Sequence, residues 1–199
     1  MRKQRLNAGQ MNKKAEIYEF KDGRLVLRKK IYVSVEEEHG KCVFSSLGRG
    51  GGGKITASFY KAAVFSPSEL LYIDGQWYAA ASVKTQQNTL YAEAVCGRCN
   101  KKTFLRRVFK ITYDNSYQRP QKKELEGVKF DGILCEKYIS EADGEHFGTE
   151  RAEKIMLFPK GTEIKSADII EVDGADYVVR GLYEGDYFNE ALLVREQDV

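Results

Sequence analysis

The 199-residue sequence lacks the features that mark several classes of protein. It has no apolar run long enough for a transmembrane helix, and its first residues lack the apolar stretch of a secretory signal. Four cysteines are too few for a disulfide framework in a chain of this length. These absences predict a soluble intracellular protein whose thiols are reduced.

Residues that commonly carry catalysis are also scarce. The only two histidines, His39 and His146, lie in polar, acid-rich stretches. There is no nucleophile elbow and no His-Glu-x-x-His motif. The acidic run at 36–38 is typical of a solvated strand edge, where like charges resist further pairing. We therefore expect that the protein is not an enzyme.

Charge of one sign is not in large excess. The net charge of +3 does not by itself favour nucleic acid as a partner. Five basic residues nevertheless precede the first acid, Glu16, and form a basic arm: Arg2, Lys3, Arg5, Lys13 and Lys14. For this arm, a solvated terminus and a contact with phosphate or with an acidic partner both stay open.

The most informative positive feature is an internal repeat. Residues 69–78, ELLYIDGQWY, recur as residues 168–177, DIIEVDGADY, with every position 99 residues later. Self-similarity at domain length indicates two copies of one fold. We place the boundary near residues 97–103, which gives domains at 1–98 and 99–199.

Each repeated block has the pattern of a β-hairpin. Two apolar runs flank an Asp-Gly pair, with the turns expected at Gly75-Gln76 and Gly174-Ala175. About six strand-like segments occur in each copy, and little of the chain has a helical pattern. The alternation in 101–111 predicts Phe104, Val108 and Ile111 as core. The expected fold is all-β: two similar small antiparallel β-barrel or sandwich domains in tandem.

A glycine-rich stretch, GRGGGGKIT at 48–56, comes close to a nucleotide-binding P-loop. Ile55 stands where that motif needs a hydroxyl, and the following residues alternate like a strand instead of opening a helix. The stretch is better explained as part of a flexible loop at 39–54. Its candidate partner-contact residues are Arg49, Gly50, Gly51, Gly52, Gly53 and Lys54.

Two alternatives involve a ligand. HGKC at 39–42 and CGRC at 96–99 together offer His39, Cys42, Cys96 and Cys99 as a tetrahedral zinc set. Four ordinary thiols, with Cys135 in a strand, are the competing interpretation. A nucleic-acid-binding β module is the other alternative, in which aromatic rings and the basic segment KKTFLRRVFK at 101–110 contact a single strand. The rings would be those of Trp77, Tyr78, Tyr91 and Phe59.

The first copy resembles the phage head–tail joining, or head-closure, family. The matching segments span residues 5–96: RLNAGQMNKKAEIYEF, IYVSVEEEHGK, a polar glycine-rich loop, KITASFY, the DGQWYAAASV hairpin and LYAEAV. The second copy matches through its hairpin and closing strand at 155–195. A tandem arrangement departs from the single-domain members of this family.

The resemblance implies a structural virion protein of the phage neck without catalysis or cofactor. Such a protein is a head–tail connector, a ring between portal and tail that helps close the head. Its implied partners are copies of itself, portal or adaptor and tail proteins, and packaged DNA through non-specific contact, with no membrane. The implied location is the virion, and the bacterial host cytoplasm during assembly.

Overall fold

The computed structural model describes residues 9, 11–40, 48–49, 53–85, 90–113, 120–137 and 154–195. Their regular structure is antiparallel β-strand, apart from one 3-10 turn, η2 (Lys61–Ala63). The strands are β1 (Lys13–Lys21), β2 (Arg24–Glu38), β3 (Gly48–Arg49), β4 (Lys54–Tyr60), β5 (Leu70–Ile73), β6 (Gln76–Thr85), β7 (Tyr91–Tyr113), β8 (Pro120–Lys137), β9 (Lys154–Pro159), β10 (Ile169–Val172), β11 (Ala175–Glu184) and β12 (Phe188–Arg195). In the part of the chain described, no helix has the length and apolar character to cross a bilayer.

The strands close two rings of hydrogen-bonded neighbours. In the first ring, β1 pairs with β2, β2 with β4, β4 with β7, β7 with β6, β6 with β5, and β5 with β1. In the second ring, the order is β7, β8, β9, β12, β11, β10 and back to β7. The all-β antiparallel class predicted from alternation is confirmed.

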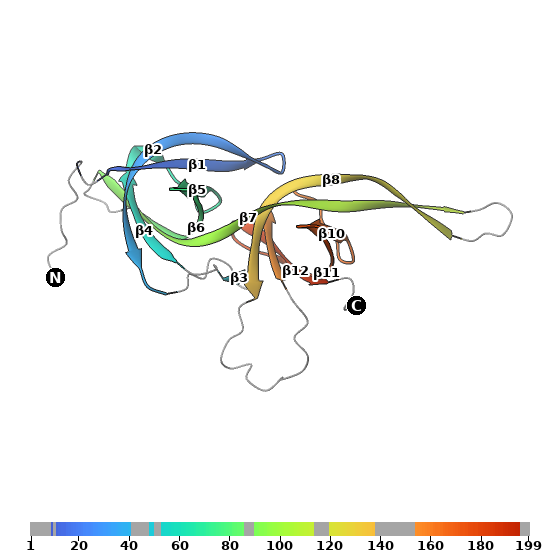
Figure 1. Cartoon of the computed structure of the whole chain (residues 1–199). Helices are drawn as coiled ribbons and strands as arrows, with labels where there is room; N and C mark the ends of the chain where they lie inside the picture. The colour runs from blue at the N-terminus through green and yellow to red at the C-terminus, as the bar shows by residue number, and fades with distance from the viewer. Residues whose placement is uncertain are drawn as a thin grey trace, which may run out of the picture.

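The two rings share strand β7, which runs through both of them (Figure 1). Cys99 still pairs with Trp77 of the first ring, whereas Asn100 pairs with Leu134 of the second. The change of partners falls within the boundary region predicted at 97–103, but the chain makes no linker there. Because one strand serves both rings, neither is a clean barrel, and all twelve strands form one continuous sheet.

Two pairing registers and one irregularity recur in both rings at the offset of 99. Ser34 pairs with Ser58 in the first ring, and Ile133 pairs with Leu157 in the second, each 99 positions later. A β-bulge interrupts β6 between residues 80 and 82, and another interrupts β11 between 179 and 181. A bulge redirects its strand, so β6 and β11 bend at corresponding positions of the two rings.

Asp-Gly pairs make three of the hairpin turns. Asp74 and Gly75 have φ values of 48° and 81°, and Asp173 and Gly174 have 53° and 75°. Two successive positive φ values match the twist of an antiparallel pair, and glycine adopts them without steric cost. The turns therefore lie one residue earlier than predicted, with Gln76 and Ala175 already in strands. The third turn, Asp22-Gly23 between β1 and β2, was not predicted.

Each ring encloses its own core. Phe59 packs edge to face on Phe65 in the first ring at a centroid distance of 5.9 Å, and Phe104 stacks on Phe130 in the second at 5.5 Å. Phe104 is fully buried, as predicted. The prediction that Ile111 is core is wrong, because Ile111 is 60% exposed, and Val108 is only half-buried. Residues 104 and 111 differ by an odd number, so they lie on opposite faces of β7.

A third apolar cluster joins the rings. It contains seven buried residues from both halves: Leu70, Ala79, Ile133, Cys135, Ile155, Leu157 and Phe188. Strand β9 explains how this cluster arises, because successive residues from Ile155 to Phe158 are all buried. Met156 and Phe158 point into the second ring, while Ile155 and Leu157 face the first. A strand buried on both faces loses its alternation, and here it fixes one ring against the other.

Candidate interaction surfaces

The predicted contact loop is attached to both rings. Gly48 and Arg49 form β3, which pairs with Lys137 and Glu136 of β8 in the second ring. Gly50, Gly51 and Gly52 lie outside the described residues. Gly53 has a φ of 88°, and its carbonyl accepts a hydrogen bond from the Arg98 amide at 2.9 Å. The backbone contact seen for the start of this loop is thus with the chain's own second ring.

Lys54, the last residue of the predicted contact set, has an internal ion pair. It opens β4, and its Nζ lies 2.5 Å from Oε2 of Glu38 on the neighbouring strand. Hydrogen bonds from Lys54 and Thr56 lower the pKa of Glu38. A lysine already held by a carboxylate is less suited to bind a partner. The contact role of Arg49 and the glycines stays a prediction.

The geometry of strand β7 argues against the predicted zinc set. Cys96 and Cys99 lie three residues apart in an extended strand, so their side chains point to opposite faces. Cys96 is buried in the first core, whereas Cys99 packs in the cluster between the rings. Cys42 lies outside the described residues, and His39 is exposed. A chelating Cys-x-x-Cys pair needs a turn, which this segment does not make.

The environment of the thiols also argues against zinc binding. Burial raises the pKa of Cys99 well above its ordinary value, with added effects of Cys135 and Cys96. Burial also raises the pKa of Cys135. A thiol with a raised pKa stays protonated at neutral pH and is a poor metal ligand. Within the described residues, no cluster of three or more His, Cys, Asp or Glu side chains is suited to hold a metal ion.

Strands β7 and β8 continue beyond the second ring as a two-stranded ribbon (Figure 1). Residues 108–113 pair with 120–125, and no third strand joins them in the described part of the chain. At about 3.4 Å per residue, the ribbon extends roughly 20 Å. A two-stranded hairpin alone is marginally stable in water. We name residues 108–113 and 120–125 the ribbon.

The ribbon and its base form a basic segment. Residues 106–129 contain seven Lys or Arg and three Asp or Glu, a net charge of +4, while the whole chain carries +3. Lys110 lies directly opposite Lys123, and both are exposed. Like charges directly opposed across two strands destabilise the pair. An anionic group placed between these lysines would remove that cost.

The base of the ribbon is held by one arginine. The Arg107 guanidinium lies 3.1 Å from carboxylate oxygens of Glu124, Glu171 and Asp176, which belong to β8, β10 and β11. A planar guanidinium suits several carboxylates at once. Arg107 therefore fixes the direction in which the ribbon leaves the second ring.

The rings are also joined by a buried carboxylate, Asp131. One carboxylate oxygen accepts from the Leu25 amide at 2.9 Å, and the other accepts from Thr103 Oγ1 at 2.6 Å and Lys101 Nζ at 3.0 Å. The Asp131 amide donates to the Gly23 carbonyl at 2.7 Å. Burial alone would raise the pKa of Asp131, but these hydrogen bonds and the lysine charge lower it. No sequence pattern had identified Asp131.

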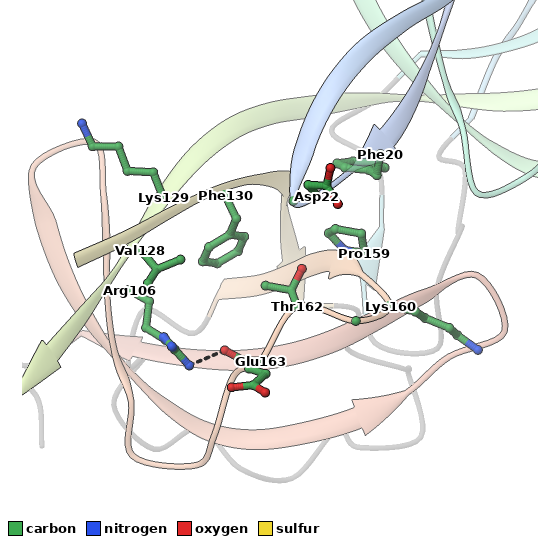
Figure 2. A pocket seen from close by; sticks show the side chains of 12 residues that line it. Phe20, Asp22, Arg106, Val128, Lys129, Phe130, Pro159, Lys160, Thr162 and Glu163 are labelled. Carbon is green, nitrogen blue, oxygen red and sulfur yellow. Dashed lines mark hydrogen bonds between the residues drawn. The ribbon is translucent and has the colours of Figure 1, made fainter. Parts of the chain in front are cut away.

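Two hollows flank the tip of the β1–β2 hairpin where the rings meet. The first, of about 430 Å³, lies between the Asp22-Gly23 turn, β8 and the turn after β9 (Figure 2). Arg106 crosses it to donate to the Glu163 carbonyl and lies 3.8 Å from Asp168. Because Arg106 has partners on its own chain, its guanidinium is not available to a ligand in this hollow.

The second hollow, of about 420 Å³, lies on the other side of Phe20 and Pro159, and we name it the junction groove. Phe20 and Phe188 contact each other edge to face in its wall, and Tyr187, which is 49% exposed, borders it. Its acids are Glu19, Glu69 and Asp186, and its one lysine is Lys160. The groove therefore combines aromatic side chains with an excess of carboxylates.

Only two of those acids are available to a partner. Glu69 is nearly buried, with Oε1 2.5 Å from Arg28 Nε and Oε2 accepting from the Ser66 amide at 2.8 Å. Glu19 and Asp186 make no ion pair within the described residues. They lie on strand β1 and on the turn between β11 and β12, so one belongs to each half of the chain.

Comparison of the chain with protein-family models, with curated proteins and with solved structures finds no match.

Proposed function

We propose that this protein is a structural component of a bacteriophage neck, a head–tail connector that assembles as a ring between portal and tail and helps close the head. It acts by shape and contact and not by catalysis. The resemblance of residues 5–96 to the head-closure family supports this proposal. The all-β architecture that the resemblance implies is the architecture of the molecule.

The observation that carries the proposal is a stiff body with one unpartnered arm. Strand β7, Asp131 and the cluster between the rings fix the two rings to each other. The ribbon leaves this body without a third strand and exposes Ile111 and Leu125. Rigid subunits with a protruding contact element are suited to symmetric assembly, in which many weak contacts add.

Duplication of one six-stranded unit accounts for the shared plan of the rings. The equal offsets of the Ser34–Ser58 and Ile133–Leu157 pairs and the matched bulges support it. The outer face of β4 carries Ser58, whereas the matching position on β9 is Leu157, which packs against the first ring. The second copy thus acquired an apolar outer face that holds the two copies together, while the glycine-rich loop belongs only to the first.

In this proposal the partners are further copies of the chain, portal or adaptor proteins and tail proteins, with non-specific contact to packaged DNA. The protein resides in the neck of the virion and in the bacterial host cytoplasm during assembly. The rigid body lies between partner rings whose surfaces do not match each other, and the glycine-rich loop adapts its conformation to them.

Electron microscopy tests this function. The purified full-length chain is mixed with a phage portal protein, and rings or caps on the portal are the expected result. The same preparation without portal is the control, because subunits can remain monomeric before assembly. A chain that leaves the portal bare, but binds zinc or oligonucleotides, would refute the connector in favour of a ligand-binding β module.

A further inference from the structure

The ribbon has the chemistry of an interface with an acidic protein surface. On one face, Lys110 and Lys123 lie side by side, and Val108 and Leu125 form the next pair along the same face. Leu125 is 43% exposed. A partner that suits this face must supply carboxylates for the lysines and apolar surface for the leucine.

Nucleic acid fits this face less well than protein. The face presents the two lysines Lys110 and Lys123 with an exposed apolar side chain, Leu125, directly beside them. The exposed leucine has no counterpart on a phosphate backbone. Ile111, on the opposite face, is 60% exposed and adds a second apolar contact of the kind that marks protein interfaces.

The junction groove offers the complementary chemistry. Glu19 and Asp186 provide two carboxylates, and Phe20, Tyr187 and Phe188 provide apolar surface beside them. A ribbon of two strands, with two lysines side by side and the Val108–Leu125 pair next to them, offers cations and apolar surface to these acids and aromatic rings. The groove and the ribbon face lie on the same molecule, so each copy carries both halves of the contact.

A ribbon does not reach the groove of its own chain. In Figure 1 the ribbon leaves the second ring and extends away from the β1–β2 hairpin, at whose tip the groove lies. Arg107, with three carboxylate partners, holds the ribbon in that direction. The two surfaces are therefore free to meet only between different copies.

We infer that the ribbon of one copy docks in the junction groove of the next, with Lys110 and Lys123 against Glu19 and Asp186. This contact is head-to-tail, so it generates a closed ring if the rotation between copies closes and a filament if it does not. The inference rests on the proposed function only for closure of the ring. The contact itself requires no portal, tail or phage.

Charge reversal on each surface tests the contact. One variant of the full chain carries K110E and K123E on the ribbon, and another carries E19K and D186K in the groove. A matched control carries K165E and R180E, two exposed basic residues that belong to neither surface, and has the same net charge as the ribbon variant. Sedimentation velocity over a range of protein and salt concentrations measures assembly, and thermal unfolding shows that each variant is folded.

The wild type and the control should self-associate, more strongly at low salt because exposed charges are screened at high salt. Each reversed variant should associate about 100-fold more weakly by itself, because two attractive pairs become repulsive. An equimolar mixture of the two variants should assemble again, because each ribbon then meets a groove of opposite charge. Recovery in the mixture also excludes misfolding as the reason for the loss.

Other outcomes overturn the inference in distinguishable ways. If the wild type assembles and both reversed variants do as well, the contact is wrong while a ring-forming connector stands. If the wild type stays monomeric at low salt, the contact is wrong, and the portal experiment alone decides the function. If a labelled oligonucleotide binds the wild type and K110E/K123E removes that binding, the partner of the ribbon is nucleic acid.

Discussion

Substitution of Asp131 by asparagine should destabilise the protein strongly and change how its stability depends on pH. Asp131 is 6% exposed, and its carboxylate accepts hydrogen bonds from Leu25, Thr103 and Lys101. Hydrogen bonds to a charged group contribute about 1.5–3 kcal/mol each, and an asparagine oxygen retains part of them. The side-chain amide nitrogen of asparagine is itself a donor, so it would face one of the donor groups that now bind the carboxylate. We expect a loss of about 3 kcal/mol at pH 7.

The sign of the pH dependence follows from the lowered pKa of Asp131. A carboxyl group whose folded pKa lies below its unfolded value, near 3.9, stabilises the fold fully above that value. The contribution is lost as the pH falls through the folded pKa. Protonated Asp131 resembles asparagine, so the difference between wild type and D131N should shrink below about pH 4.

Urea unfolding between pH 3 and pH 7 measures both effects. The matched control is D173N, which removes an exposed carboxylate 2.8 Å from Lys102 and should cost less than about 1 kcal/mol. The reasoning is wrong if D131N and D173N cost the same at pH 7. It is also wrong if the D131N difference is unchanged between pH 7 and pH 3, since an ionised carboxylate would then not be its source.

Three further outcomes are expected. G132A should lower the free energy of unfolding by about 2–3 kcal/mol, because its new Cβ would lie 2.5 Å from the Leu157 carbonyl oxygen. An unchanged urea midpoint would show that β9 can shift to make room for the methyl group. F104A should cost about 3–5 kcal/mol and I111A less than about 0.5 kcal/mol, and equal costs would refute the assignment of faces on β7. In a C42S/C99S variant, the two remaining thiols, Cys96 and Cys135, should react slowly with a disulfide reagent until the chain is unfolded, and rapid reaction of the native protein would contradict their burial.

The hairpins and the all-β class could be predicted because their causes are local. Alternating apolar residues create strands with one buried face, and Asp-Gly tolerates the two positive φ values of a tight turn. The offset of 99 was visible for the same reason, since it repeats these local signals at 72–78 and 171–177. The third turn, Asp22-Gly23, carried the same signal and could have been found.

The surfaces could not be predicted, because they depend on register between distant strands. Nothing in the local sequence indicates that Lys110 lies opposite Lys123, since that pairing is set by the length of the turn between them. Cys96 and Cys99 matched the spacing of a metal ligand pair, and only their place in an extended strand puts the two thiols on opposite faces. Glu19 and Asp186 are 167 positions apart and meet only because the rings pack together.

The sequence by itself determined the strands, most turns and the repeat, since each follows from a few neighbouring residues. Tertiary structure alone decided that β7 passes from one ring to the other where a domain boundary was expected. It also decided that β9 is buried on both faces and that Ile111 lies on the exposed side of the ribbon. Hydrogen bonding between strands far apart in the chain settles these points, because alternation shows that a strand has two faces but not what covers each one.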